Sequence, residues 1–327
     1  MICHDDAVSL GGLTARGDNS PALFWWAWLS IAAAIATIAL KYWAYLLTDS
    51  VGLLSDALES VVNLIAAVVA LIALIIAARP ADRTHHYGHG KVEYFSAGIE
   101  GLMIVVAAIV ILYSAVERLL HPQPLEALGI GLLITLIATG VNAAAGWLIL
   151  RAGRLHRSVT LVADGKHLMT DVWTSIGVFI GVGLVALTGW LPLDSIVAIA
   201  VGLNILWTGF GLARICVHGL MDRALNAADE ASVIDVLNSF VSQYSQGELA
   251  FHALKTRASG QQRFISMHVL VPGRWTVEAG HDLVEKVESA IAIALPGSQI
   301  QTHLEPIEDP RSYDDAGDGH AGIDTSA

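Results

Sequence analysis

Residues 51–77 read VGLLSDALESVVNLIAAVVALIALIIA, and this stretch decides the fold. A bilayer core about 30 Å thick needs roughly 20 apolar residues to cross it as a helix. The stretch is long enough, and it carries Asp56, Glu59 and Asn63 in its first half. Polar and ionisable groups at membrane depth are costly and usually functional. These residues therefore predict a membrane-spanning helix with a functional site on it.

Five more stretches are long and apolar enough to span a bilayer. They are 22–47, 92–119, 127–150, 161–187 and 191–217. The whole chain is 54% apolar and only 15% charged, whereas an ordinary soluble domain carries about 25% charged residues. The composition therefore indicates a polytopic membrane protein with six spans at 22–221, preceded by a polar tail at 1–21.

Basic residues in the connections indicate the orientation. Lys and Arg cluster after the second and fourth spans, at Arg79, Arg83, Lys91, Arg151, Arg154 and Arg157. Because basic loops stay in the cytoplasm, we expect both termini there. We read the first residues as a cytoplasmic tail and not as a signal peptide, because they show no cleavage-site pattern. The compact chain favours a bacterial inner membrane.

The chain changes character near Asp222. From there to the end it holds seven Lys and Arg against sixteen Asp and Glu, so an acidic surface argues against a nucleic-acid partner. The pattern predicts helix, strand, strand, helix and strand at 227–244, 249–257, 263–271, 277–295 and 299–304. This order suits a ferredoxin-like α+β domain at 222–309. Residues 310–327 are expected to be a disordered acidic tail.

Four polar residues are expected to meet inside the membrane. Glu59 and Asn63 are four residues apart, as are His167 and Asp171, so each pair shares one helix face. At 1.5 Å per residue they lie roughly 9 to 18 Å from the membrane surface at which each helix begins. Two carboxylates, an imidazole and an amide oxygen suit a divalent metal, with which protons compete. Hydrogen bonding between packed helices is the alternative.

Other polar residues in the spans carry weaker signals. Asp56 is expected either to support a metal ligand or to accept a hydrogen bond from a neighbouring helix. We expect Glu100 and Asn142 to be structural, and Asp194 to cap a helix.

Two histidine-rich regions are further candidates for metal sites. The loop after the second span brings Asp82, His85 and His89 into reach of one cation, with His86 as an alternative ligand. An exposed loop without a metal explains that composition equally well. In the soluble part, the candidate ligands are His252, His268, His281, His303 and Glu305. Alternation along 263–271 places Ile265, Met267, Val269 and Val271 in the core and His268 on the opposite face.

Together these features resemble the cation diffusion facilitator family, and in particular its bacterial ferrous-iron and zinc efflux branch. The resemblance rests on the motif around Glu59, the sequence HHYGHGK at 85–91, His167 with Asp171, and the C-terminal strands. It implies a homodimer that exchanges cytoplasmic divalent metal for protons by alternating access. It also implies a membrane transport site, a loop site and a cytoplasmic binuclear site at the residues named above. By the same resemblance, Lys91 and Asp222 form a charge interlock near the dimer interface.

The sequence departs from the family at the second-span pair. Zinc transporters of the family usually have two carboxylates, or a histidine and a carboxylate, where this chain has Glu59 and Asn63. A neutral amide removes one negative charge, which either favours harder ions such as Mn²⁺ or Fe²⁺ over Zn²⁺ or changes the number of protons exchanged per metal. Glu305 replaces the commoner aspartate, which alters its reach.

These observations lead to the hypothesis of a proton-coupled efflux transporter for divalent metal. Zn²⁺ is favoured as substrate and as cytoplasmic ligand, with Fe²⁺, Mn²⁺, Co²⁺ and Cd²⁺ as alternatives and no organic cofactor. A scaffold that binds metal through its cytoplasmic domain without transporting it is the second hypothesis. We do not expect an enzyme, because the chain lacks a His-Glu-x-x-His motif, and we do not expect an ATP-driven pump, because it lacks a P-loop.

Overall fold

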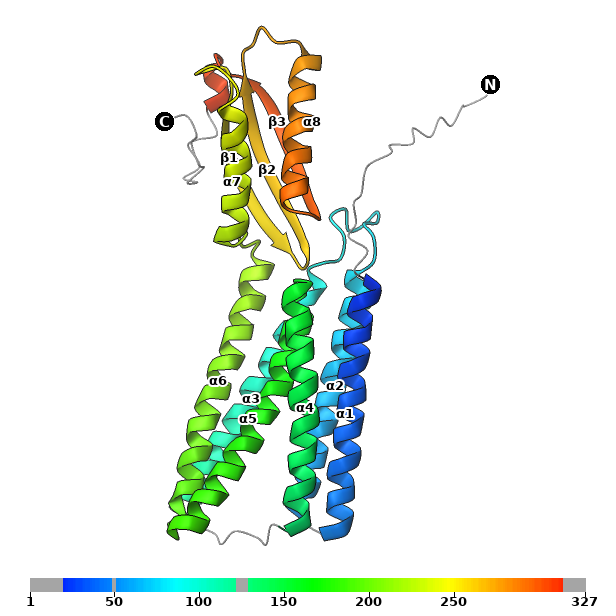
Figure 1. Cartoon of the computed structure of the whole chain (residues 1–327), viewed down its shortest axis with the longest axis vertical. Coiled ribbons are helices and arrows are strands. Elements are labelled where there is room, and N and C mark those ends of the chain that lie inside the picture. The colour runs from blue at the N-terminus through cyan, green and yellow to red at the C-terminus, as the bar shows by residue number, and fades with distance from the viewer. Residues whose placement is uncertain (1–19, 49–50, 122–128, 314–327) are drawn as a thin grey trace, which may run out of the picture. The chain divides into compact units, whose positions relative to one another are not determined.

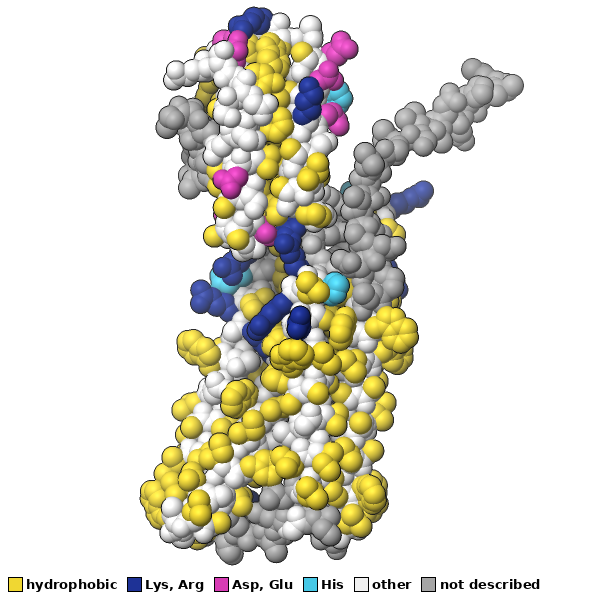
Figure 2. Space-filling model, viewed as in Figure 1, with side chains coloured by type: hydrophobic (Ala, Val, Ile, Leu, Met, Phe, Trp, Pro, Cys, Tyr) yellow, Lys and Arg dark blue, Asp and Glu magenta, His cyan; other side chains and the backbone are white. Residues whose placement is uncertain are grey.

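A computed structural model describes residues 20–48, 51–121 and 129–313, and within these ranges six helices are long and apolar enough to cross a membrane (Figure 1). They are α1 (Ser20–Thr48), α2 (Val51–Ala77), α3 (Val92–Leu120), α4 (Gly129–Leu155), α5 (Val159–Thr188) and α6 (Pro192–Leu220). Hydrophobic side chains cover these helices, and Lys and Arg side chains gather near the end at which α6 finishes (Figure 2). The predicted six-span architecture is confirmed. The polar tail predicted at 1–21 lies outside the described residues except for its last two, which begin α1.

Several helices run beyond their predicted ends. α4 continues through Arg151 and Arg154 to Leu155, because long basic side chains reach polar surroundings while their helix still packs. α5 begins at Val159, where the Ser158 hydroxyl caps it by accepting from the Leu161 N–H at 3.3 Å. Buried Glu93 at the start of α3 accepts from that same hydroxyl at 2.6 Å, so the starts of α3 and α5 are fixed together.

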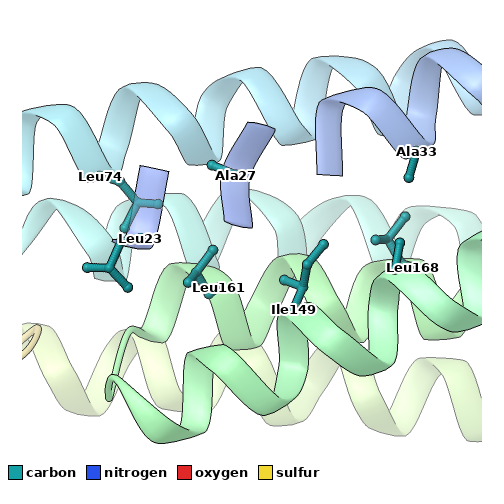
Figure 3. Close-up of a cluster of buried hydrophobic side chains, with 8 residues drawn as sticks. Leu23, Ala27, Ala33, Leu74, Ile149, Leu161 and Leu168 are labelled. Atoms are coloured by element: carbon teal, nitrogen blue, oxygen red, sulfur yellow. The ribbon is translucent and has the colours of Figure 1, made fainter. Parts of the chain in front are cut away.

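The helices pack in two groups around small residues. Leu23, Leu74, Ile149, Leu161 and Leu168, with three alanines, form a buried cluster between α1, α2, α4 and α5 (Figure 3). α4 and α5 approach closely there, because a Cβ added to Gly165 would meet the Leu150 backbone N at 2.8 Å. A second cluster joins α3, α5 and α6, and it includes Ala97, Ala163 and Leu212. α5 therefore belongs to both groups and is central to the bundle.

The C-terminal part contains α7 (Ala227–Val241), β1 (Ala250–Ser259), β2 (Gln262–Val271), α8 (Val277–Ala294) and β3 (Ser298–Pro306). The strands form a sheet in the order β1-β2-β3, and β2 pairs with β3 in parallel, as a βαβ unit requires. Asn226 caps α7 by accepting from the N–H groups of Ala228 and Asp229. The predicted core positions Ile265, Met267, Val269 and Val271 are at most 4% exposed. The expected α-β-β-α-β domain is confirmed.

The described residues form two compact units, and the border between them differs slightly from the change in composition near Asp222. One unit holds residues 19–224 together with the hairpin tip 257–262, and the other holds the rest of the C-terminal part. The predicted disorder from residue 310 is wrong for 310–313. The Ser312 hydroxyl donates to the Pro306 carbonyl at 2.9 Å, and the Tyr313 hydroxyl donates to the Ile307 carbonyl at 3.0 Å. Residues 314–327 lie outside the described part.

Candidate functional site

Three of the four predicted transport-site residues form one hydrogen-bonded chain inside the bundle. His167 on α5 donates from Nε2 to Asn63 Oδ1 on α2 at 2.8 Å. The Asn63 amide in turn donates from Nδ2 to Asp171 Oδ2, one turn further along α5. Asn63 and His167 are 5% and 6% exposed. The four-residue spacing of His167 and Asp171 on α5 therefore brings both side chains to Asn63, as the sequence predicts for these three residues.

Glu59 lies beside this chain without joining it. Its side chain is exposed on α2, and no hydrogen bond from another described residue reaches its carboxylate. It is close enough to Asp171 for the two charges to interact. A cation placed between Glu59 and Asp171 would relieve this repulsion.

Asp56 is engaged in an ion pair one turn before Glu59. Lys41 on α1 donates from Nζ to Asp56 Oδ1 at 2.7 Å, and Lys41 is only 6% exposed. This ion pair neutralises the charge of the buried Lys41 ammonium, and it joins α1 to α2. Of the two roles expected for Asp56, this contact matches the acceptor for a neighbouring helix.

Asn142, which we expected to be structural, also contacts Asp171. Its Nδ2 donates to Asp171 Oδ2 at 3.4 Å from the middle of α4, and the side chain is 2% exposed. Its Oδ1 is buried and has no partner among the described residues. Buried amide oxygens are normally satisfied, so this one is available to a cation at Asp171. The expectation of a purely structural residue overlooked that α4 faces α5 at this depth.

Removing the Asn142 amide should weaken metal binding without unfolding the bundle. We expect Asn142→Ala to lower transport-site affinity by about 10-fold, because residues that hold a ligand typically contribute that much. Titration of purified protein with zinc and manganese measures the effect. Asn204→Ala on the exposed side of α6 is the matched control. Equal metal affinities in wild type and Asn142→Ala would show that the Asn142 amide contributes to packing and not to metal binding.

The loop residues predicted as a second site are also adjacent. One nitrogen of His85, one of His89 and a carboxylate oxygen of Asp82 lie within 4.8 Å of one another. Asp82 Oδ1 accepts from the Thr84 hydroxyl and from the N–H groups of Thr84 and His85, which holds the pKa of Asp82 well below its usual value. The Asp82 carboxylate is therefore ionised, and its hydrogen bonds hold it in a fixed orientation. His86 hydrogen-bonds the Arg83 carbonyl instead.

Lys91 and Asp222 form the expected ion pair, and a third residue joins them. Lys91 Nζ is 3.0 Å and Arg257 Nη1 is 3.1 Å from Asp222 Oδ1. Desolvation opposes ionisation of Asp222, but hydrogen bonds and charges from Lys91 and Arg257 outweigh it and lower its pKa. Arg257 also stacks over the Tyr87 ring at 5.0 Å. The sequence analysis missed Arg257, which lies far along the chain in the β1–β2 hairpin.

The cytoplasmic candidates centre on Glu305 at the end of β3. Its Oε2 is 3.2 Å from His252 Nε2 and 3.1 Å from His268 Nδ1, while its Oε1 is 3.5 Å from His303 Nε2. The parallel register places His268 opposite His303. His252, His268 and Glu305 offer one ligand atom each within 4.8 Å, a two-histidine and one-carboxylate set typical of zinc.

His281 does not join this cluster within the chain. It lies on the exposed side of α8, where its Nε2 is 3.9 Å from Glu285 Oε1. Strand alternation constrained the direction of His268, whereas the position of His281 on a helix gave no such constraint.

Comparison with known proteins identifies the family of this chain. Residues 27–221 match the family model of the cation efflux transmembrane domain, and residues 229–307 match that of the cation efflux protein cytoplasmic domain. The uncharacterised transporter sll1263 of Synechocystis sp. is 52% identical over 87% of this chain and 91% of its own length. The cation-efflux pump FieF of Klebsiella pneumoniae is 30% identical over 84% of this chain and 90% of its own. The chain is therefore an integral membrane transporter that belongs to the cation diffusion facilitator family.

Proposed function

We propose that this protein exports a divalent metal cation in exchange for protons, as a homodimer with both termini in the cytoplasm of a bacterial cell. Zn²⁺ is the favoured substrate, and Fe²⁺, Mn²⁺, Co²⁺ and Cd²⁺ are alternatives. The observation that carries the proposal is the buried chain from His167 through Asn63 to Asp171.

The donor set at this position suits a divalent ion. Asp171 supplies a carboxylate, Asn63 an amide oxygen and His167 an imidazole, while Glu59 supplies a second carboxylate at the exposed side. Nitrogen with oxygen ligands accommodates zinc, iron, cobalt and manganese. The two carboxylates match the charge of a divalent cation, so the loaded site is close to neutral inside the membrane.

The same atoms account for proton coupling. His167 Nε2 lies 2.8 Å from Asn63 Oδ1, and Glu59 and Asp171 supply two carboxyl groups beside it. A protonated imidazolium must lose a proton, and a protonated carboxyl must ionise, before either can bind metal. Metal and protons therefore occupy the site alternately, and alternating access converts that competition into exchange.

We further propose that the cytoplasmic cluster, which consists of His252, His268, His303 and Glu305, regulates transport. Glu305 directs its two oxygens to different histidines, which is the arrangement of a carboxylate that bridges two ions. We assign metal sensing to His252, His268, His303 and Glu305. Metal held there would favour the transport-competent state in proportion to its difference in affinity for the two states.

Metal uptake into proteoliposomes tests the function. Purified protein is reconstituted, and Zn²⁺, Fe²⁺, Mn²⁺, Co²⁺ and Cd²⁺ are supplied in parallel, with protein-free vesicles as a control. We expect saturable uptake of at least one ion together with proton movement in the opposite direction. Binding to the cytoplasmic histidines without uptake of any ion would favour the scaffold hypothesis.

Asn63 should set the order of preference among these ions. Asn63→Asp restores a second-span carboxylate, and we expect zinc and cadmium to gain about 10-fold over manganese and iron. Asn63→Ala is the matched control, because it removes the amide without adding charge and should weaken every ion. An unchanged order in Asn63→Asp would show that this position does not select the metal.

A further inference from the structure

Two fully buried carboxyl groups lie between α3 and α5, apart from the residues assigned above. Glu100 on α3 is 0% exposed and Asp164 on α5 is 1% exposed. Asp164 Oδ1 accepts from the Ser30 hydroxyl at 2.9 Å, and Glu100 Oε1 accepts from the Ser96 hydroxyl at 3.4 Å. The second oxygen of each carboxyl, Glu100 Oε2 and Asp164 Oδ2, has no partner among the described residues.

The segments of α3 and α5 that carry the two carboxyl groups pack together. Ala97, one turn before Glu100, shares a buried cluster with Ala163, which precedes Asp164, and a charge on Asp164 acts on Glu100. No salt bridge to either carboxyl occurs within the described ranges. Two adjacent carboxylates without a cation cannot both be ionised in such surroundings, so the pair retains at least one proton.

Few groups on the neighbouring helices could neutralise a negative charge on Glu100 or Asp164. α1 contributes the Ser30 hydroxyl, and α6 places the Cys216 thiol against Gly98 on α3. α4 presents Leu150 to Gly165, and its Arg151 and Arg154 are exposed. The titratable groups nearby along α3 and α5 themselves are Glu93, Lys166 and His167.

The position of the pair relates it to the transport site. Asp164 precedes His167 by about one helical turn and Asp171 by two, so Asp164 and Asp171 are about 10 Å apart along the axis of α5. The three lie on the same side of that helix. Asp164 is nearer to the start of α5, which lies at the end of the bundle where α6 finishes, and the orientation proposed above makes this the cytoplasmic end.

We propose that Glu100 and Asp164 form a proton-holding station between the transport site and the cytoplasmic end of the bundle. This inference rests on the proton-coupled function proposed above. At rest one of the two carboxyl groups is protonated and the other is ionised, so the pair carries one negative charge. When a metal ion displaces a proton from the transport site, that proton passes to the pair and neutralises it. The pair then releases a proton to cytoplasmic water and regains its single charge.

Rapid mixing of the full-length protein with zinc tests the station. A pH-sensitive dye follows proton release, and zinc binding is measured separately at equilibrium. In Glu100→Gln and Asp164→Asn we expect zinc affinity to stay within about twofold of wild type, while proton release and transport slow on the order of 100-fold. The double variant should be no slower than either single variant, because the pair acts as a unit. Glu117→Gln, an exposed position on α3, is the matched control and should behave like wild type.

Two results would overturn the station while leaving the proposed function intact. One is proton release at the wild-type rate in both single variants. The other is slower release accompanied by weaker zinc binding and a lower unfolding temperature, which would assign the pair to helix packing. A wild-type protein that binds zinc without releasing any proton would instead contradict the proton-coupled function itself.

Discussion

Asp171→Asn is expected to reduce metal transport by at least about 100-fold, because it removes the carboxylate to which both Asn63 and Asn142 donate. The asparagine has nearly the same shape, so the bundle should still fold and assemble. The loss should affect every transported ion, since a carboxylate is common to all of the ligand sets considered. Initial rates of zinc uptake in proteoliposomes measure it.

Asp194→Asn provides the control for this variant. Asp194 lies in the first turn of α6 and is 3.7 Å from Arg118, near the end of the bundle where α5 finishes. It undergoes the same chemical change inside the same domain, and its transport should remain within about twofold of wild type. Wild-type transport by Asp171→Asn would remove this residue from the ion pathway.

The second large effect is expected at the cytoplasmic cluster. Glu305→Gln removes the carboxylate that contacts His252, His268 and His303, and we expect zinc affinity there to fall about 10- to 100-fold. Zinc should then raise the unfolding temperature of the variant less than that of wild type, because bound metal stabilises only the folded state. Zinc content and thermal unfolding of the purified protein measure both effects.

Glu285→Gln on α8 is the matched control for the cytoplasmic cluster. Glu285 is exposed and lies near His281, away from the other histidines of this chain. We expect its zinc content to equal that of wild type. Full zinc binding by Glu305→Gln would mean that the histidines hold metal without the carboxylate, or that metal binds elsewhere.

The helices could be predicted from the sequence because a bilayer imposes a length and a composition on each span. Residues 51–77 show both properties, and α2 has the same limits. The ends of α4 and α6 could not be predicted, since Arg151, Arg154 and His218 continue these helices beyond the apolar stretch. Hydropathy locates the hydrocarbon layer, whereas hydrogen bonding and capping determine where a helix stops.

The residues of the candidate sites could be predicted where their spacing along a helix or strand fixes the direction of their side chains. Four-residue spacing aligned His167 with Asp171, and strand alternation turned His268 away from the core. Asn142 had no partner at helical spacing, so only the packing of α4 against α5 shows its contact with Asp171. His281 was grouped with the other histidines by composition alone, and α8 places it elsewhere.

Metal movement driven only by a pH gradient tests the central claim most directly. Proteoliposomes are prepared with equal zinc concentrations inside and outside, and a pH gradient is imposed across the membrane. Proton-coupled exchange predicts that zinc accumulates on the acidic side, reverses direction when the gradient is reversed, and stays level in Asp171→Asn vesicles. Zinc that remains equal on both sides in wild-type vesicles, while an imposed zinc gradient still dissipates through the protein, would contradict coupling to protons.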